Sequence, residues 1–166
     1  MSSKPAARWT RRAAILGAAA LAGCGFSPAF GPNGPARGLR NAIEFQTPDT
    51  VEGYRLRERL ERRLGAPEAP RYVLNVTLDL NRSDVAIASD GEAGRITLNG
   101  KARYSLSDMA GTPIASGHVD AFTGYSTNGS TVATRAGEED ARLRLANILA
   151  GLIVARLMAI SANLPE

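Results

Sequence analysis

The sequence predicts one α+β domain, in which two helices pack on one face of a four-stranded, largely antiparallel sheet in the order β-α-β-β-β-α. Apolar and polar residues alternate over residues 72–80 and 95–106, as in strands with one buried face. Over residues 51–64 and 135–161, apolar residues recur at helical spacing instead. Strands joined by short turns pair antiparallel and need no helix to connect them. Both helices can therefore pack on one face of the sheet.

Residues 1–23 are predicted to be a cleaved signal peptide. Four basic residues and no acidic one precede a short run of small apolar residues. That run has about 10 residues, whereas a helix that crosses a bilayer needs about 20. We therefore expect an export signal and not a permanent membrane anchor.

Cys24 follows this run directly, in the sequence Leu21-Ala22-Gly23-Cys24. The motif resembles the lipobox of bacterial lipoproteins, in which the thiol is lipidated, the chain is cleaved before the cysteine, and the new amine is acylated. Cys24 is the only cysteine, so it forms no intramolecular disulfide. We expect lipidation of Cys24 and membrane attachment through the lipid. The alternatives are an ordinary signal peptide with an incidental cysteine, or a buried free thiol.

Once the leader is set aside, the charge of the chain is balanced. The leader holds four of the 20 Lys and Arg residues and none of the 16 Asp and Glu residues. Binding to nucleic acid relies on an excess of positive charge, so this composition argues against that class of protein.

Residues 24–38 are predicted to be a lipidated, flexible tether, and residues 39–166 the α+β domain. The tether is rich in Gly and Pro, with Phe26 and Phe30 interleaved. Those two aromatic side chains could pack on the domain or enter the membrane interface, and the sequence leaves both open.

The domain is predicted to begin with a short strand over residues 41–46, followed by a helix over residues 51–64 that ends at Gly65. Leucine recurs every fourth residue along the helix, and opposite charges lie four residues apart on its outer surface. The leucines are Leu56, Leu60 and Leu64, and the charged pairs are Arg57 with Glu61 and Glu58 with Arg62.

Three strands are predicted next, over residues 72–80, 95–106 and 113–123. Asn99-Gly100 is a hairpin signal, but the alternation continues through it in phase, so we predict one long strand. The third strand alternates poorly and contains proline, which favours a position at the sheet edge.

A polar loop over residues 124–134 is predicted to lead into a long helix over residues 135–161. We expect one apolar stripe of this helix to face the sheet. Its arginines argue against a membrane span. The predicted stripe consists of Ala141, Leu145, Ile148, Leu149 and Leu152, and the arginines are Arg142, Arg144 and Arg156.

The sequence offers no catalytic constellation. The only histidine, His118, falls on the predicted edge strand, and acylation would remove the only thiol. The chain has no Gly-x-Ser-x-Gly motif, no phosphate-binding glycine loop and no Cys/His cluster with metal-ligand spacing. We predict a protein that is not an enzyme and that needs no cofactor or metal.

Three motifs together resemble the LptE family of lipopolysaccharide-assembly lipoproteins. They are the start Cys24-Gly25-Phe26-Ser27-Pro28, the helix opening Gly53-Tyr54-Arg55-Leu56, and the second helix opening Glu138-Glu139-Asp140-Ala141-Arg142. The predicted order of elements also matches that family. The resemblance implies an outer-membrane lipoprotein that binds lipopolysaccharide and acts as plug and assembly partner of the β-barrel LptD.

Arg95, Lys101 and Arg103 are the candidate contact residues. By the period of two they lie on the outward face of the predicted strand 95–106. Arginine and lysine form strong charge-assisted bonds to phosphate and carboxylate. We expect them to contact lipid A phosphates or acidic residues of a barrel lumen; the alternative is a solvated strand face.

Two other functions remain open from the sequence. One is a periplasm-facing lipoprotein that serves as accessory subunit of another lipid-transport or secretion system. The other is a cell-wall or lipid hydrolase, against which the missing catalytic residues argue.

Overall fold

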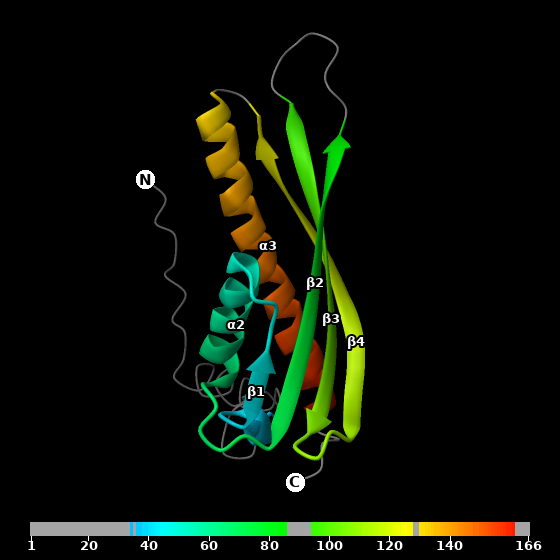
Figure 1. The fold of residues 1–166 in the computed structure, drawn as a ribbon. Helices are drawn as coiled ribbons and strands as arrows, with labels where there is room; N and C mark the ends of the chain where they lie inside the picture. The colour runs from blue at the N-terminus through cyan, green and yellow to red at the C-terminus, as the bar shows by residue number, and fades with distance from the viewer. Residues whose placement is uncertain (1–33, 35, 86–93, 128–129, 162–166) are drawn as a thin grey trace, which may run out of the picture.

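The computed structural model describes residues 34, 36–85, 94–127 and 130–161, so Cys24 and the predicted leader lie outside the described residues. The predicted order of elements is confirmed (Figure 1). The elements are the 3-10 helix η1 (Arg37–Leu39), β1 (Ile43–Gln46), α2 (Val51–Leu64), β2 (Tyr72–Val85), β3 (Arg95–Asp108), β4 (Pro113–Ser126) and α3 (Thr131–Ile160).

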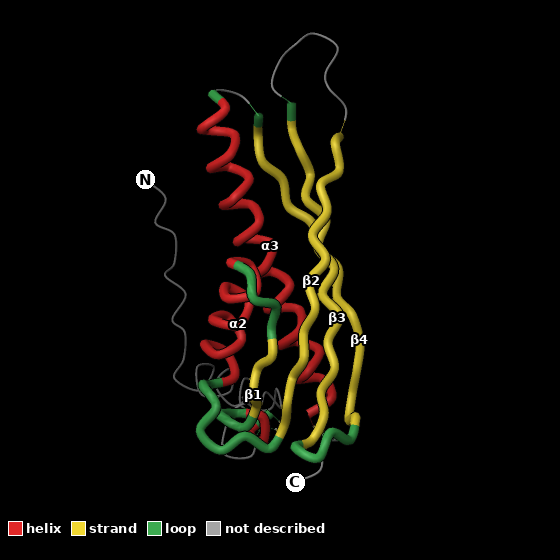
Figure 2. Tube along the Cα trace, in the orientation of Figure 1, coloured by secondary structure: helices red, strands yellow, loops and turns green. Residues whose placement is uncertain are grey.

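The four strands form one mixed sheet in the order β1-β2-β3-β4. β1 runs parallel to β2, and the two remaining pairs are antiparallel. Both helices lie on one face, here called the inner face, and the opposite face is the outer face (Figures 1 and 2). α2 and β1 occupy one half of the length, whereas the other half holds only α3 and the three long strands. The predicted edge position of β4 is confirmed.

α2 covers the predicted residues, and its two ends are fixed by local bonds. The Thr50 hydroxyl caps the N-terminus by accepting a hydrogen bond from the Gly53 amide at 3.1 Å. The C-terminus ends at Gly65, whose φ of +89° suits glycine. On its outer surface the predicted ion pairs are confirmed, with Arg57 to Glu61 at 2.8 Å and Arg62 to Glu58 at 3.6 Å.

The three long strands extend beyond their predicted ends, and the predicted polar loop 124–134 is wrong. β4 continues to Ser126, and α3 begins at Thr131 and not at residue 135. The Ser130 hydroxyl accepts a hydrogen bond from the Ala133 amide and starts the helix there. A serine cap inside a polar stretch gives no hydropathy signal, which explains the late predicted start.

The buried face of α3 also differs from the predicted stripe. Ile148 and Leu152 are 43% and 38% exposed. α3 packs against both α2 and the sheet, so its buried surface spans two directions and includes small residues that a single apolar stripe omits. The buried residues of α3 are Ala141, Leu145, Ala146, Leu149, Ala150, Ile153, Val154 and Leu157.

Gly100 lets α3 approach the sheet closely. A Cβ built at Gly100 would lie 2.9 Å from Leu145 Cδ2 and 3.0 Å from Leu149 Cδ1. The glycine that signalled a hairpin in the sequence is therefore the point at which α3 crosses the uninterrupted strand β3.

Of the described helices, only α3 is long and apolar enough, by length and composition, to cross a membrane. The predicted argument from the arginines does not exclude a membrane span by composition, because Arg156 is the only charged residue within residues 145–160. A helix that lines a protein core meets the same criterion, and eight residues of α3 are buried in this domain.

Candidate functional site

The outer face of β3 carries the three predicted basic residues, and the neighbouring strands place carboxylates beside one of them. Lys101 lies opposite Asp79 of β2 and opposite Asp120 of β4 in the strand register. Directly opposite side chains on one face of a sheet lie close enough to interact. Lys101 is therefore flanked by negative charge on both sides.

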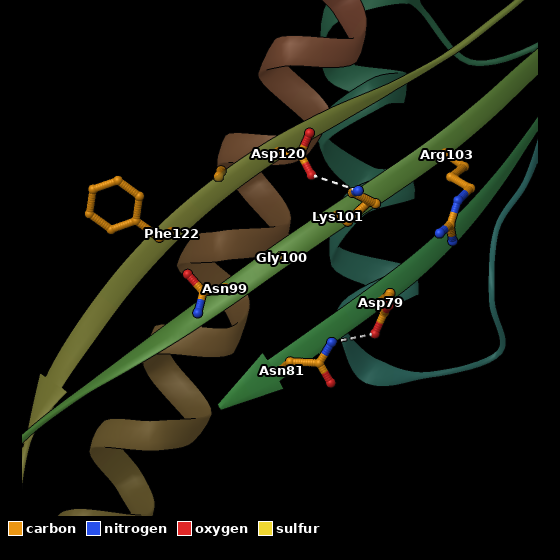
Figure 3. Close-up of a pocket in the computed structure, with 9 residues that line it drawn as sticks. Asp79, Asn81, Asn99, Gly100, Lys101, Arg103, Asp120 and Phe122 are labelled. Atoms are coloured by element: carbon orange, nitrogen blue, oxygen red, sulfur yellow. Dashed lines mark hydrogen bonds and ion pairs between the residues drawn. The ribbon is translucent and has the colours of Figure 1, made fainter. Parts of the chain in front are cut away.

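A hollow of about 460 Å³ opens on the outer face around Lys101 (Figure 3). We call it the outer hollow. β2, β3 and β4 all contribute to it, and its polar side chains come from the outward positions of these strands. It is lined by Asp79, Asn81, Asn99, Gly100, Lys101, Arg103, Asp120, Ala121 and Phe122.

The charges in the outer hollow are partly paired. Lys101 Nζ lies 3.5 Å from Asp120 Oδ1, and Asn81 donates a hydrogen bond of 2.8 Å to Asp79. Arg103 makes no ion pair with the residues that the structure describes, and it points across β2 near Asp79 in Figure 3. Within this hollow, Arg103 is the cation best placed to meet an external anion.

Arg95 does not join Lys101 and Arg103. It lies six residues from Lys101 along β3, a distance of about 20 Å in an extended strand. Arg95 instead lines a second hollow of about 350 Å³, together with Arg144 of α3. The three predicted contact residues thus share a face but belong to two places on it.

Phe122 stands between these two hollows and lines both. It is 74% exposed beside the polar side chains of the outer hollow, and in Figure 3 its ring projects away from the sheet. Sequence analysis missed Phe122 and Asp120, because the alternation of residues 113–123 was too weak to assign their face. The signal that could have found them is the register with β3, in which Phe122 lies opposite Asn99 and Asp120 opposite Lys101.

The two helix openings that resemble the LptE motifs meet on the inner face. Arg142 of α3 forms an ion pair with Glu138 at 2.9 Å and reaches Glu52 of α2 at 3.7 Å. The Tyr125 hydroxyl of β4 donates a hydrogen bond of 3.2 Å to Glu138. The cluster joins α2, α3 and β4, so we assign it to holding the helices on the sheet.

The cluster shifts the pKa of two of its members. The hydrogen bond from Arg142 holds the pKa of Glu138 below its ordinary value, and the Tyr125 hydroxyl acts in the same direction. Burial raises the pKa of Tyr125, and the hydrogen bond to Glu138 raises it further.

Glu138 is expected to contribute to acid sensitivity. Because its pKa is lower in the folded state, the unfolded chain takes up the proton first as the pH falls. The stabilisation is complete above the ordinary glutamate pKa and is lost as the pH falls through the folded value. Urea unfolding at about pH 6 and about pH 3.5 should therefore show a smaller loss of stability for Glu138→Gln than for wild type. Equal losses would contradict this role.

The described residues show no arrangement for catalysis. His118 lies exposed on β4 with Nε2 3.6 Å from Asp120, and no hydroxyl hydrogen-bonds to it among the described residues. No group of three His, Cys, Asp or Glu residues in the described part of the chain could hold a metal ion.

One comparison with known proteins identifies a family, and a second shows the fold. Residues 41–157 match the sequence model of LptE, described as lipopolysaccharide-assembly. No curated protein matches the chain at a significant level. Solved structures with the same fold include three lipoproteins, all under 25% identical to this chain.

The similar structure from Caulobacter crescentus, a lipoprotein, has a TM-score of 0.63 and 23% identity, and the match covers 78% of this chain and 97% of that one. The minor lipoprotein from Acinetobacter baumannii has a TM-score of 0.57 and 20% identity, with coverage of 72% and 91%. Rare lipoprotein B from Shewanella oneidensis has a TM-score of 0.57 and 15% identity, with coverage of 74% and 97%.

Proposed function

Because this chain belongs to the LptE family of lipopolysaccharide-assembly lipoproteins, we propose that it acts at the outer membrane as the plug and assembly partner of the β-barrel LptD. The observation that carries the proposal is the family match over residues 41–157. Membership makes the protein an envelope lipoprotein of a family that is not enzymatic. The runner-up role, an accessory subunit of another lipid-transport or secretion system, has no specific support from the fold.

The surface of the domain supports a plug role. The lumen of a large membrane barrel is polar, so a domain that sits inside it needs a polar exterior. The outer face meets this need with acidic, basic and amide side chains from three strands. Lipidation of Cys24, together with the predicted tether, which reaches the domain where η1 begins at Arg37, would hold such a domain at the membrane while leaving it free to enter a barrel.

Arg95, Lys101 and Arg103 are proposed to contact lipopolysaccharide or the acidic lining of the barrel. Arg95 and Arg103 make no ion pair with the described residues, so their charge is available to a partner. Charge reversal of Lys101 would place a third carboxylate between Asp79 and Asp120. Repulsion among the three would lower the stability of the domain, so a change in lipopolysaccharide affinity could not be assigned to the lost contact alone.

Charge reversal at the two arginines is expected to weaken lipopolysaccharide binding without unfolding the domain. Arg95→Glu and Arg103→Glu should each lower the affinity for lipopolysaccharide in detergent by about tenfold, because a bond between charged groups is lost and repulsion is added. Arg156→Glu, on the exposed side of α3, is the matched control and should bind normally. Unchanged affinity in both strand variants would remove these residues from the contact surface.

The proposed function is tested by purification of the tagged lipoprotein from envelopes in mild detergent, with mass spectrometry of the proteins that accompany it. Recovery of a large outer-membrane barrel, together with a fall in surface lipopolysaccharide on depletion, would support the proposal. Recovery of an inner-membrane transporter or a secretion subunit would replace it with the runner-up.

A further inference from the structure

The lining of the outer hollow does not suit a bare phosphate group. Two carboxylates, Asp79 and Asp120, face the same space as Lys101 and Arg103. The Lys101 ammonium is already 3.5 Å from Asp120, so an anion that approached it would also meet that carboxylate. A ligand for this hollow must offer donors to the carboxylates as well as acceptors to the cations.

The side-chain amides of Asn81 and Asn99 also call for a ligand that carries both hydrogen-bond donors and acceptors. Asn81 and Asn99 each carry one acceptor oxygen and two donor hydrogens. Together with the carboxylates and cations, they present donors and acceptors side by side over a short distance (Figure 3). A row of hydroxyl groups matches this lining, because each hydroxyl both donates and accepts a hydrogen bond.

Phe122 provides an apolar platform at the side of the hollow. Its ring is largely exposed, and among the described residues no other large apolar side chain lines the hollow. The face of an aromatic ring carries partial negative charge and attracts groups with partial positive charge. The C–H face of a pyranose ring is such a group, and its hydroxyls project around the rim.

We propose that the outer hollow binds a saccharide, with a pyranose ring packed against Phe122 and its hydroxyls bonded to Asp79, Asn99 and Asp120. The proposal rests on the proposed function and deepens it, since it assigns this hollow to the sugar portion of a glycolipid. Phosphate groups of the same ligand are left to Arg103 at the rim and to Arg95 beside Arg144.

The test uses the full lipoprotein purified in detergent and two separate probes. The first is the dephosphorylated, lipid-free core oligosaccharide of lipopolysaccharide, and the second is inorganic phosphate. The oligosaccharide should bind and shift the side-chain amide signals of Asn81 and Asn99 in NMR spectra, while phosphate should leave them in place.

Phe122→Ala should weaken oligosaccharide binding by about tenfold, and Asn99→Ala by about fivefold. Both positions are exposed, so these variants should fold normally. Two matched controls lie outside the hollow and should bind as wild type. Val132→Ala removes another exposed apolar side chain, and Asn75→Ala another amide of the outer face.

Oligosaccharide binding that is unaffected by Phe122→Ala and Asn99→Ala would overturn the assignment of the hollow. If phosphate shifts the side-chain amide NMR signals of Asn81 and Asn99 and the oligosaccharide does not, the ligand of the hollow is not a saccharide. Either result leaves the proposed function standing, because that function fails only if depletion leaves surface lipopolysaccharide unchanged or no barrel is recovered.

Discussion

Gly53→Ala is expected to destabilise the domain by about 2–3 kcal/mol. A Cβ at this position would lie 2.0 Å from the Pro48 carbonyl oxygen and 2.9 Å from the Pro48 carbonyl carbon. Both atoms belong to the backbone of the turn that leads into α2, so no side chain can rotate to make room. The first turn of α2 must move, and with it the Thr50 cap on the Gly53 amide.

Gly151→Ala is the matched control, since it also replaces a helical glycine. A Cβ at Gly151 would meet no atom within 4 Å. Alanine is favoured over glycine in a helix interior, so this variant should gain about 0.5–1 kcal/mol. Urea unfolding monitored by circular dichroism measures both changes. Equal stability of the two variants would show that the turn at Pro48 yields to the extra methyl group.

In a chain whose residues 1–23 are replaced by a signal peptide that is cleaved without lipidation, Cys24→Ser is expected to release nearly all of the protein from the membrane. Serine cannot receive the thioether-linked lipid, and each methylene buried in a bilayer contributes about 0.8 kcal/mol. With several acyl chains lost, the domain should appear in the soluble periplasmic fraction after salt washing. Separation of envelope and soluble fractions, followed by immunodetection, measures the shift.

The control for this variant is the stability of the released domain. Cys24 lies outside the described core, so Cys24→Ser and wild type should show the same urea midpoint. Retention of the serine variant in the envelope after washing would mean that a partner protein or the apolar surface of α3 holds the domain there, and that the lipid is dispensable for attachment.

The sequence contained enough information for the layers and for β3 in detail. Alternation over residues 95–106 placed Ile96, Leu98 and Ala102 inward and Lys101 outward, as the structure has them. A strand with one buried face repeats every two residues, so its pattern survives without knowledge of its neighbours.

The outer hollow and the buried face of α3 depend on which elements lie beside them in the folded chain, and the hydropathy pattern of one element does not contain that information. Asp120 reaches Lys101 only through the β3–β4 register, and small residues such as Gly117 and Ala121 blur the alternation of β4. Ile148 looked like part of the stripe because it is apolar, whereas Ala146 and Ala150, which are buried, contribute little to such a pattern. Because α3 packs against both α2 and the sheet, a single helical period of apolar residues does not identify its whole buried surface.

The order of the elements has a consequence for how the chain acquires its structure. β2, β3 and β4 pair antiparallel with their sequence neighbours, so these three strands can assemble before α3 is complete. α3, which covers β3 and β4, is the last element of the chain. In a chain that emerges from a translocon N-terminus first, the inner face of β3 and β4 stays uncovered until the final helix arrives. A chaperone that shields this side during export would act in that interval, before the domain closes.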